Sequence, residues 1–192
     1  MKTIERIGSV FLLLAAMLWM TACSDMTDGK TFYERAMEKI PLPKGCSEWK
    51  YLPNDYDGDG KIEVFAFGGE EDGDWKYLEA YYIEPNGKVT QVLCDSHLRG
   101  MPRGEKKDFS DCYLTIGKQK YANFAVGDVE GSCVYTMVFG VYNKRPIVDY
   151  MSGSAYEVTE EGYVVCPDIS MEYVYAVRNG KFVLVKETVI PI

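Results

Sequence analysis

Histidine, positive charge and long apolar runs are scarce in this chain of 192 residues, and each shortage narrows the range of functions. A single histidine, His97, argues against catalysis built on histidine. The 21 Lys and Arg residues against 29 Asp and Glu give a net charge of −8, so we do not expect a nucleic-acid partner, because phosphate binding requires clustered basic side chains. Neither a Gly-x-Ser-x-Gly motif nor a phosphate-binding loop occurs.

The beginning of the chain predicts a secretory signal. Lys2 and Arg6 precede the apolar run Val10–Met20, whose eleven residues fall short of the roughly 20 that a membrane-spanning helix requires. The following stretch, Met20-Thr21-Ala22-Cys23, resembles the lipobox of bacterial lipoproteins, in which the cysteine is lipidated and becomes the new N-terminus. The alternative is an ordinary signal followed by a chance cysteine. The resemblance implies a signal peptide over residues 1–22 and a lipid on Cys23.

The lipobox resemblance also implies a location. The protein would be held in the bacterial cell envelope, on a membrane, through its lipid anchor. In lipoproteins of the Gram-negative type, Asp directly after the cysteine retains the protein in the inner membrane. Ser24 occupies that position here, so we expect the outer membrane, on its periplasmic or surface face.

A short polar tether over residues 23–30 precedes one predicted helix. Thr31 followed by Glu34 forms a capping-box pattern, which is typical of a helix N-terminus. Pro41 and Pro43 end the pattern, so we expect a helix over about residues 31–40.

The remainder of residues 31–192 predicts a single β-rich domain. Runs rich in β-branched and aromatic residues alternate with turn signals such as Pro85-Asn86-Gly87 and Arg178-Asn179-Gly180-Lys181. We expect a mainly β fold of antiparallel sheets built from hairpins. The predicted strands are Ile62–Phe67, Trp75–Ile83, Lys88–Leu93, Cys112–Ile116, Ser132–Tyr142, Met171–Val177 and Phe182–Thr188.

Two stretches of the chain are similar in sequence. Asp55-Tyr56-Asp57-Gly58 and the strand after it are similar to Asp128-Val129-Glu130-Gly131 and its strand, and residues 80–89 match residues 155–164 at several positions. This internal similarity predicts a diverged duplication with units at about residues 46–115 and 119–190. Chance similarity among tyrosine-rich strands is the open alternative.

An acidic loop between the tether and the first buried strand predicts a metal site. Its carboxylates alternate along the chain, so a curled loop can point them at one centre, and Gly58 and Gly60 permit the positive φ that such a curl requires. Hard oxygen ligands in a flexible ring favour Ca²⁺ over Mg²⁺. The candidate ligands are Asp55, Asp57, Asp59, the carbonyl of Lys61, and Glu63.

The pattern Asp-x-Asp-x-Asp-Gly-x-x-Glu entering a strand resembles the calcium loop of FG-GAP/VCBS-type repeats, found in integrin-like propellers and bacterial envelope proteins. An EF-hand is disfavoured, because Ala66 stands at the twelfth position, where an EF-hand has glutamate. Position 9 is Glu63, where the integrin loops have Asp. A solvated acidic turn without metal is the alternative, and it is the preferred interpretation of the second acidic stretch, Glu70–Asp74.

Five cysteines remain beside Cys23, so at most two disulfides can form. Cys94–Cys112 is the pair that brackets a loop between predicted strands, but buried thiols that fill core space are an equal alternative. A Cys–His nucleophile or a zinc site involving His97 is disfavoured, since neither has the required spacing. The five cysteines are Cys46, Cys94, Cys112, Cys133 and Cys166.

These features together predict a lipid-anchored envelope protein whose calcium-stabilised β domain is a binding or assembly module rather than an enzyme. Its partner would be an envelope protein or a glycan. The alternative is an envelope glycan hydrolase that uses paired carboxylates, which requires two carboxyl groups about 5–10 Å apart in a cleft.

Overall fold

The computed structural model describes residues 29–69, 78–95, 98–101, 113–128, 134–153 and 157–191. Within these ranges the chain forms one helix and thirteen strands. The helix is α2 (Phe32–Met37), and the strands are β1 (Glu48–Asn54), β2 (Glu63–Gly69), β3 (Leu78–Ile83), β4 (Val89–Asp95), β5 (Leu98–Met101), β6 (Tyr113–Ile116), β7 (Gln119–Asp128), β8 (Val134–Tyr142), β9 (Arg145–Ser152), β10 (Glu157–Val158), β11 (Val164–Pro167), β12 (Met171–Arg178) and β13 (Lys181–Val189). The predicted signal peptide and Cys23 lie outside the described residues.

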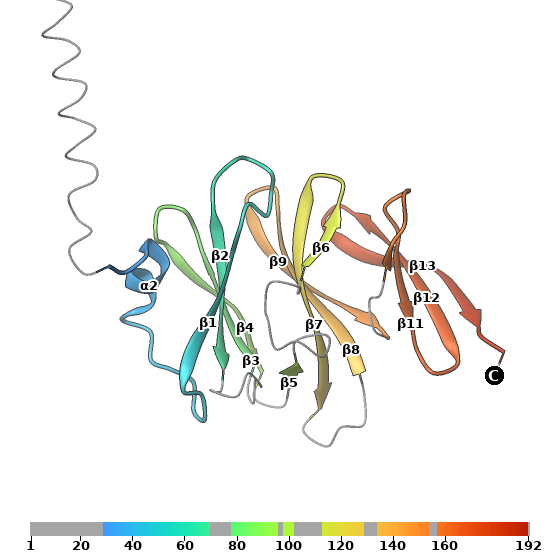
Figure 1. Ribbon diagram of the computed structural model, residues 1–192, viewed down its shortest axis with the longest axis horizontal. Coiled ribbons are helices and arrows are strands. Elements are labelled where there is room, and N and C mark those ends of the chain that lie inside the picture. Colours follow the sequence, from blue (N-terminus) through green and yellow to red (C-terminus); the bar gives the residue numbers. More distant parts are fainter. Residues whose placement is uncertain are drawn as a thin grey trace, which may run out of the picture.

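The strands form three antiparallel sheets, which confirms the predicted fold class (Figure 1). Sheet 1 has the order β1-β2-β3-β4, and sheet 3 has the order β10-β11-β12-β13. Sheet 2 has the order β5-β7-β8-β9, with β6 as a fifth strand that also pairs with β7. In sheets 1 and 3, successive strands along the chain are neighbours, as expected from hairpins joined in series.

The helix α2 begins as the sequence predicts and ends earlier. The capping box is present: the Glu34 N–H donates to the Thr31 side chain, and the Thr31 N–H donates to the Glu34 carboxylate. The helix stops at Met37 rather than near Ile40, and the Ile40 N–H closes a final turn on the Met37 carbonyl. Proline disfavours a helical conformation in the residue before it, so Pro41 limits the helix from its C-terminal side.

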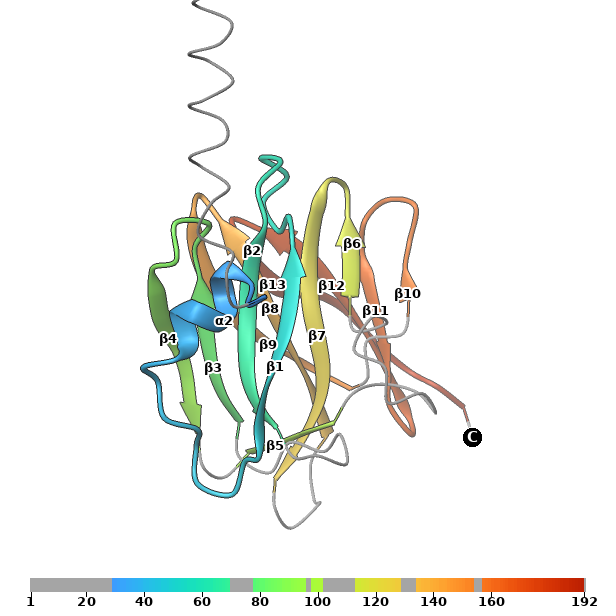
Figure 2. The same cartoon turned by 60° about the vertical axis from the view of Figure 1, so that its left-hand side comes forward.

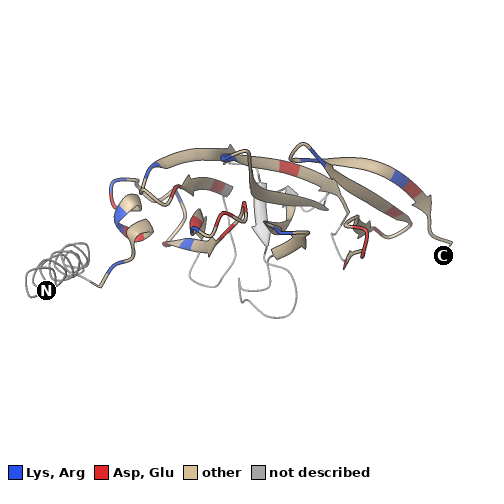
Figure 3. Ribbon diagram, turned by 90° about the horizontal axis from the view of Figure 1, so that it is seen from above, with Lys and Arg blue, Asp and Glu red and all other residues tan. Residues whose placement is uncertain are grey.

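The elements stack in four layers, in the order α2, sheet 1, sheet 2, sheet 3 (Figures 1 and 3). Strand β2 shows why sheet 1 needs a cover on both faces, because every one of its residues is buried. Val64 and Ala66 pack towards the helix with Met37, whereas Phe65 and Phe67 pack towards sheet 2. A strand that is buried on both faces has an almost continuous apolar sequence, as β2 does.

The core between sheets 1 and 2 is aromatic. Phe65 and Phe67 of β2 contact Phe139 of β8 with ring centroids 5.6 and 4.9 Å apart, and Phe67 also contacts Phe124 of β7 at 5.0 Å. The opposite face of sheet 2 supplies Leu114, Tyr121, Val138 and Met151 to a second core with sheet 3. Successive side chains of β7 and β8 point to opposite faces of sheet 2, so these two strands contribute residues to both cores.

Hairpin turns gather at one edge of the stack, the upper edge in Figures 1 and 2. The connections β1–β2, β3–β4, β6–β7, β8–β9 and β10–β11 all lie there. We call this edge the turn edge. Among the described residues, none belongs to a helix that is long and apolar enough to cross a membrane.

The predicted duplication stays a prediction, whereas the predicted disulfide is wrong. The loop after Asp55 joins β1 to β2, and Asp128 ends β7 directly before the β7–β8 connection, but residues 129–133 and 154–156 lie outside the described ranges. Cys112 and Cys133 lie outside them as well. The expected Cys94–Cys112 disulfide is not formed, because Cys94 is a free cysteine. Cys94 is exposed, and Cys166 is buried with its Sγ 3.9 Å from Met151 Sδ.

Candidate metal centre

The acidic loop between β1 and β2 is anchored by Tyr56. This side chain is fully buried, its hydroxyl donates to the Leu52 carbonyl at 2.9 Å, and its ring meets Phe65 edge-on at 4.9 Å. Asp55 and Asp57 flank Tyr56 in the chain and are only partly buried. Insertion of one aromatic ring into the core therefore leaves the two neighbouring carboxylates near the surface.

Sheet 2 also holds the loop. The Lys120 backbone N–H donates to the Tyr56 carbonyl at 3.3 Å, and the Lys120 ammonium group donates to Asn54 Oδ1 at 3.0 Å. A Cβ atom at Gly58 would lie 3.6 Å from the Lys118 carbonyl oxygen, so the loop rests closely on the β6–β7 turn. The position of the loop thus depends on contacts between two sheets.

Asp55 closes the curl that the sequence predicts. One of its carboxylate oxygens accepts the Gly58 N–H at 2.8 Å, and the other accepts the Gly60 N–H at 3.0 Å. Gly58 and Gly60 have φ of 76° and 86°, which confirms the expected positive values. These conformations are available to glycine without the steric cost that a Cβ atom adds.

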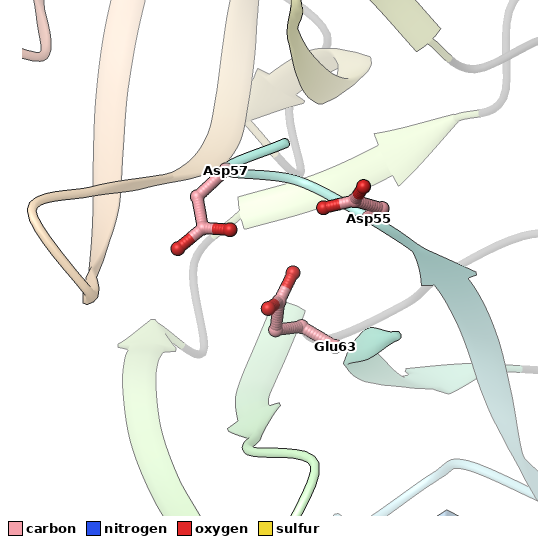
Figure 4. A group of neighbouring side chains, drawn as sticks. All are labelled: Asp55, Asp57 and Glu63. Carbon is pink, nitrogen blue, oxygen red and sulfur yellow. The ribbon is translucent and has the colours of Figure 1, made fainter. Parts of the chain in front are cut away.

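The curl brings three of the predicted side chains together. One carboxylate oxygen from each of Asp55, Asp57 and Glu63 lies within 4.8 Å of the others (Figure 4). Asp55 and Asp57 come from the loop, whereas Glu63 is the first residue of β2. Three converging carboxylates form an oxygen-rich group that could hold a metal ion.

Glu63 is the buried member of the cluster, with 3% of its surface exposed. Its Oε2 accepts the Tyr56 N–H at 2.9 Å. Burial raises the pKa of the Glu63 carboxyl above its ordinary value; the Tyr56 N–H opposes this shift, and the neighbouring aspartate charges add to it. A buried carboxylate beside two like charges is costly without a cation.

Asp59 and Lys61 form a different arrangement. The Lys61 N–H donates to Asp59 Oδ1 at 2.9 Å, and the Lys61 ammonium group lies 3.1 Å from Asp59 Oδ2. These hydrogen bonds lower the pKa of Asp59. Asp59 is therefore paired with a cation of the chain itself, and the assignment of Asp59 and the Lys61 carbonyl as ligands stays a prediction.

A cavity of about 460 Å³ opens beside the cluster at the turn edge. Asp57 and Glu63 line it together with Tyr82 of β3, Glu84 of the β3–β4 turn and Lys144 of the β8–β9 turn. Tyr82 and Lys144 were not predicted as site residues. No local sequence signal marks them, because only the stacking of sheet 1 on sheet 2 brings Lys144 to this cavity.

No protein-family model, no curated protein and no solved structure matches this chain. His97, the residue of the disfavoured zinc and nucleophile sites, lies outside the described residues. Within the ranges that the structure describes, the acidic cluster and the turn edge are the features that bear on function.

Proposed function

We propose that this protein is a lipid-anchored protein of the bacterial cell envelope, whose β domain binds Ca²⁺ and acts as a binding or assembly module. The observation that carries the proposal is the convergence of the Asp55, Asp57 and Glu63 carboxylates in an anchored loop. The anchor is the lipid on Cys23 that the lipobox resemblance implies, in the outer membrane.

Calcium is the cation that this group favours. Two oxygens on opposite sides of Ca²⁺, at about 2.3–2.6 Å from it, are about 4.6–5.2 Å apart, so oxygens within 4.8 Å of one another suit its coordination sphere. Mg²⁺ holds its ligands closer and retains its waters. The ion stabilises the folded protein because its positive charge cancels the mutual repulsion of the three carboxylates.

Two further ligands complete the proposed site. On binding, the Asp59 carboxylate exchanges the Lys61 ammonium group for the ion, and the Lys61 carbonyl joins it. This set is the one implied by the resemblance to FG-GAP/VCBS loops. The loop leads directly into strand β2 at Glu63, as the resemblance implies, and this supports the proposed set.

Calcium would act on the whole stack rather than on one loop. The loop contacts Lys120 of sheet 2, so an ion that rigidifies the loop also strengthens the contact between sheets 1 and 2. The turn edge then presents short, well-held turns on a rigid scaffold. Loops on a rigid scaffold are the usual place for recognition, which supports a binding role.

Thermal unfolding of the full chain in detergent, in millimolar calcium and in chelator, tests the calcium site. At 100 times Kd, calcium stabilises by about 2.7 kcal/mol, or about 5–11 °C in Tm for a domain of this size. Asp57→Ala should abolish the difference between the two conditions. Asp59→Ala should do the same if Asp59 is a ligand, and should leave the difference intact if Asp59 only pairs with Lys61.

Asp168→Ala is the matched control. Asp168 is an exposed aspartate whose carboxylate accepts a backbone N–H, that of Ile169, but it lies in the β11–β12 connection. The loop aspartates likewise accept backbone N–H groups, from residues two to five positions further on. Asp168→Ala should leave the calcium effect unchanged. Superimposable melting curves of the unmodified chain in calcium and in chelator would reject the proposed site.

A further inference from the structure

A second cavity of about 460 Å³ opens at the turn edge, between sheets 2 and 3. Its walls come from the β6–β7 turn, the β10–β11 turn and the end of β12. It shares no lining residue with the cavity beside the acidic cluster. Its lining residues include Ile116, Glu160, Glu161, Tyr163, Val177 and Arg178.

The β10–β11 turn that forms one wall is held by its own hydrogen bonds. The Thr159 N–H donates to the Tyr163 carbonyl, and the Gly162 N–H donates to the Thr159 carbonyl, both at 2.9 Å. Gly162 has φ of 83°, and a Cβ atom there would lie 3.5 Å from the Ile116 side chain. The turn is therefore preorganised against sheet 2, which lowers the entropy cost of binding.

The polar groups of the cavity combine acceptors with donors. Glu160 and Glu161 are exposed carboxylates, and hydrogen bonds from the Glu161 backbone N–H and the Thr159 hydroxyl lower the pKa of Glu161. Arg178, at the end of β12, is exposed and forms no ion pair with another described residue. Its guanidinium group presents five N–H donors in a planar fork.

The apolar part of the cavity lies next to these groups. Tyr163 is 40% exposed, so part of its ring is accessible to a ligand. Ile116 and Val177 supply aliphatic surface, and both are partly buried against the core between sheets 2 and 3. The cavity therefore offers an aromatic ring and an aliphatic wall beside two carboxylates and one guanidinium group.

We propose that this cavity binds one sugar residue of a neutral glycan. A pyranose has an apolar C–H face that packs on an aromatic ring, and hydroxyl groups around its edge that both donate and accept hydrogen bonds. The cavity matches each property: Tyr163 meets the face, the carboxylates accept and Arg178 donates. Its volume lies within the range of about 300–1,000 Å³ that is usual for small-molecule sites.

The mixed charge of the cavity favours a neutral sugar over anionic or cationic ligands. An anion would meet Glu160 and Glu161, and a cation would meet Arg178, whereas neutral hydroxyl groups pair with both. The inference rests on the proposed role as a binding module but not on calcium, because no candidate calcium ligand lines this cavity.

Calorimetric titration of the full chain with cellohexaose, maltohexaose and chitohexaose tests the proposal, in a zwitterionic detergent that carries no sugar. We expect at least one of the three to bind with Kd below about 1 mM. Tyr163→Ala and Arg178→Ala should each weaken that binding about tenfold or more. Glu161→Gln, an exposed and nearly isosteric change, provides a third test if either variant folds poorly.

The matched controls are Tyr150→Ala and Arg145→Ala, which replace exposed residues of the same types on β9. Both should retain binding within about twofold. Lack of binding by all three hexasaccharides, equal loss in the controls, or tighter binding of hexalysine would overturn the proposal. Each titration is run in calcium and in chelator: sugar binding without a calcium effect on Tm would reject the calcium site alone, and the reverse would reject the sugar site alone.

Discussion

Replacing Glu63 by glutamine should change stability in opposite directions with and without calcium. In chelator, the substitution removes one of three converging negative charges, and that charge is the buried one. The carboxamide oxygen of the introduced glutamine can still accept the Tyr56 N–H, and its NH₂ group can donate to the aspartates. In calcium, the same substitution removes a charged ligand.

The magnitude follows from the separation of the carboxylates. The carboxylate oxygens lie within 4.8 Å of one another, and two unit charges at that upper limit repel by about 0.9 kcal/mol in water and by about 3.5 kcal/mol at an effective dielectric constant of 20. Asp55 and Asp57 are partly exposed, so the lower figure is the better guide for each pair. We expect Glu63→Gln to raise the free energy of unfolding in chelator by about 1–3 kcal/mol, or Tm by about 2–12 °C.

The assay is thermal unfolding at pH 7 in both conditions, with Glu63→Ala as the comparison. Glu63→Ala leaves the buried Tyr56 N–H without its acceptor, so it should destabilise the protein by about 1–3 kcal/mol more than Glu63→Gln in either condition. Equal destabilisation by Glu63→Gln in calcium and in chelator would refute the account of the cluster as a repulsive group that requires a cation.

Two predictions concern the anchor and the core. Cys23→Ala should yield a species without acyl chains that no longer partitions into detergent, as mass spectrometry and phase separation would report; an unchanged acyl mass would exclude Cys23 as the attachment site. Gly140→Ala should lower the free energy of unfolding by about 1–3 kcal/mol, because its Cβ would lie 2.5 Å from the fully buried Tyr121 ring. Combining it with Tyr121→Leu should cost less than the two single changes added together, and strict additivity in denaturant titrations would contradict the contact.

Local features could be predicted because they depend on neighbouring residues. The capping box of Thr31 and Glu34, the glycines of the acidic loop and the Asn179-Gly180 turn each follow from backbone geometry over a few positions. Strand β2 was predicted from its apolar sequence, and β12 and β13 were predicted from their β-branched and aromatic residues.

Strands β1, β7 and β9 were not among the predicted strands. Pro53 lies in β1, Pro146 lies in β9, and β7 contains Asn123 and Gly127, all residues that disfavour a strand when judged locally. They adopt extended structure because neighbouring strands pair with them along most of their length. Pairing between strands outweighs the intrinsic preference of a single residue.

Part of the candidate site could likewise be predicted from the sequence, and part could not. Alternating carboxylates and two glycines predicted an oxygen-rich loop, and the curl of that loop needs little beyond its own hydrogen bonds. Tertiary structure decided the positions of Asp55 and Asp57, since burial of Tyr56 in the core fixes both. The pairing of Asp59 with Lys61 is local, because the two residues are only two positions apart.

The sequence by itself determined that the chain forms antiparallel hairpins and carries an acidic, glycine-containing loop, because periodicity, caps and turns act over a few residues. Tertiary structure alone decided the order of the layers and the two cavities at the turn edge. Lys144 lines the first cavity, and Ile116 lines the second together with Gly162 and Arg178, only because the sheets pack face to face. Burial of apolar area is non-directional, so the sequence pattern shows that a face must be covered, and only the packed fold shows which face covers it.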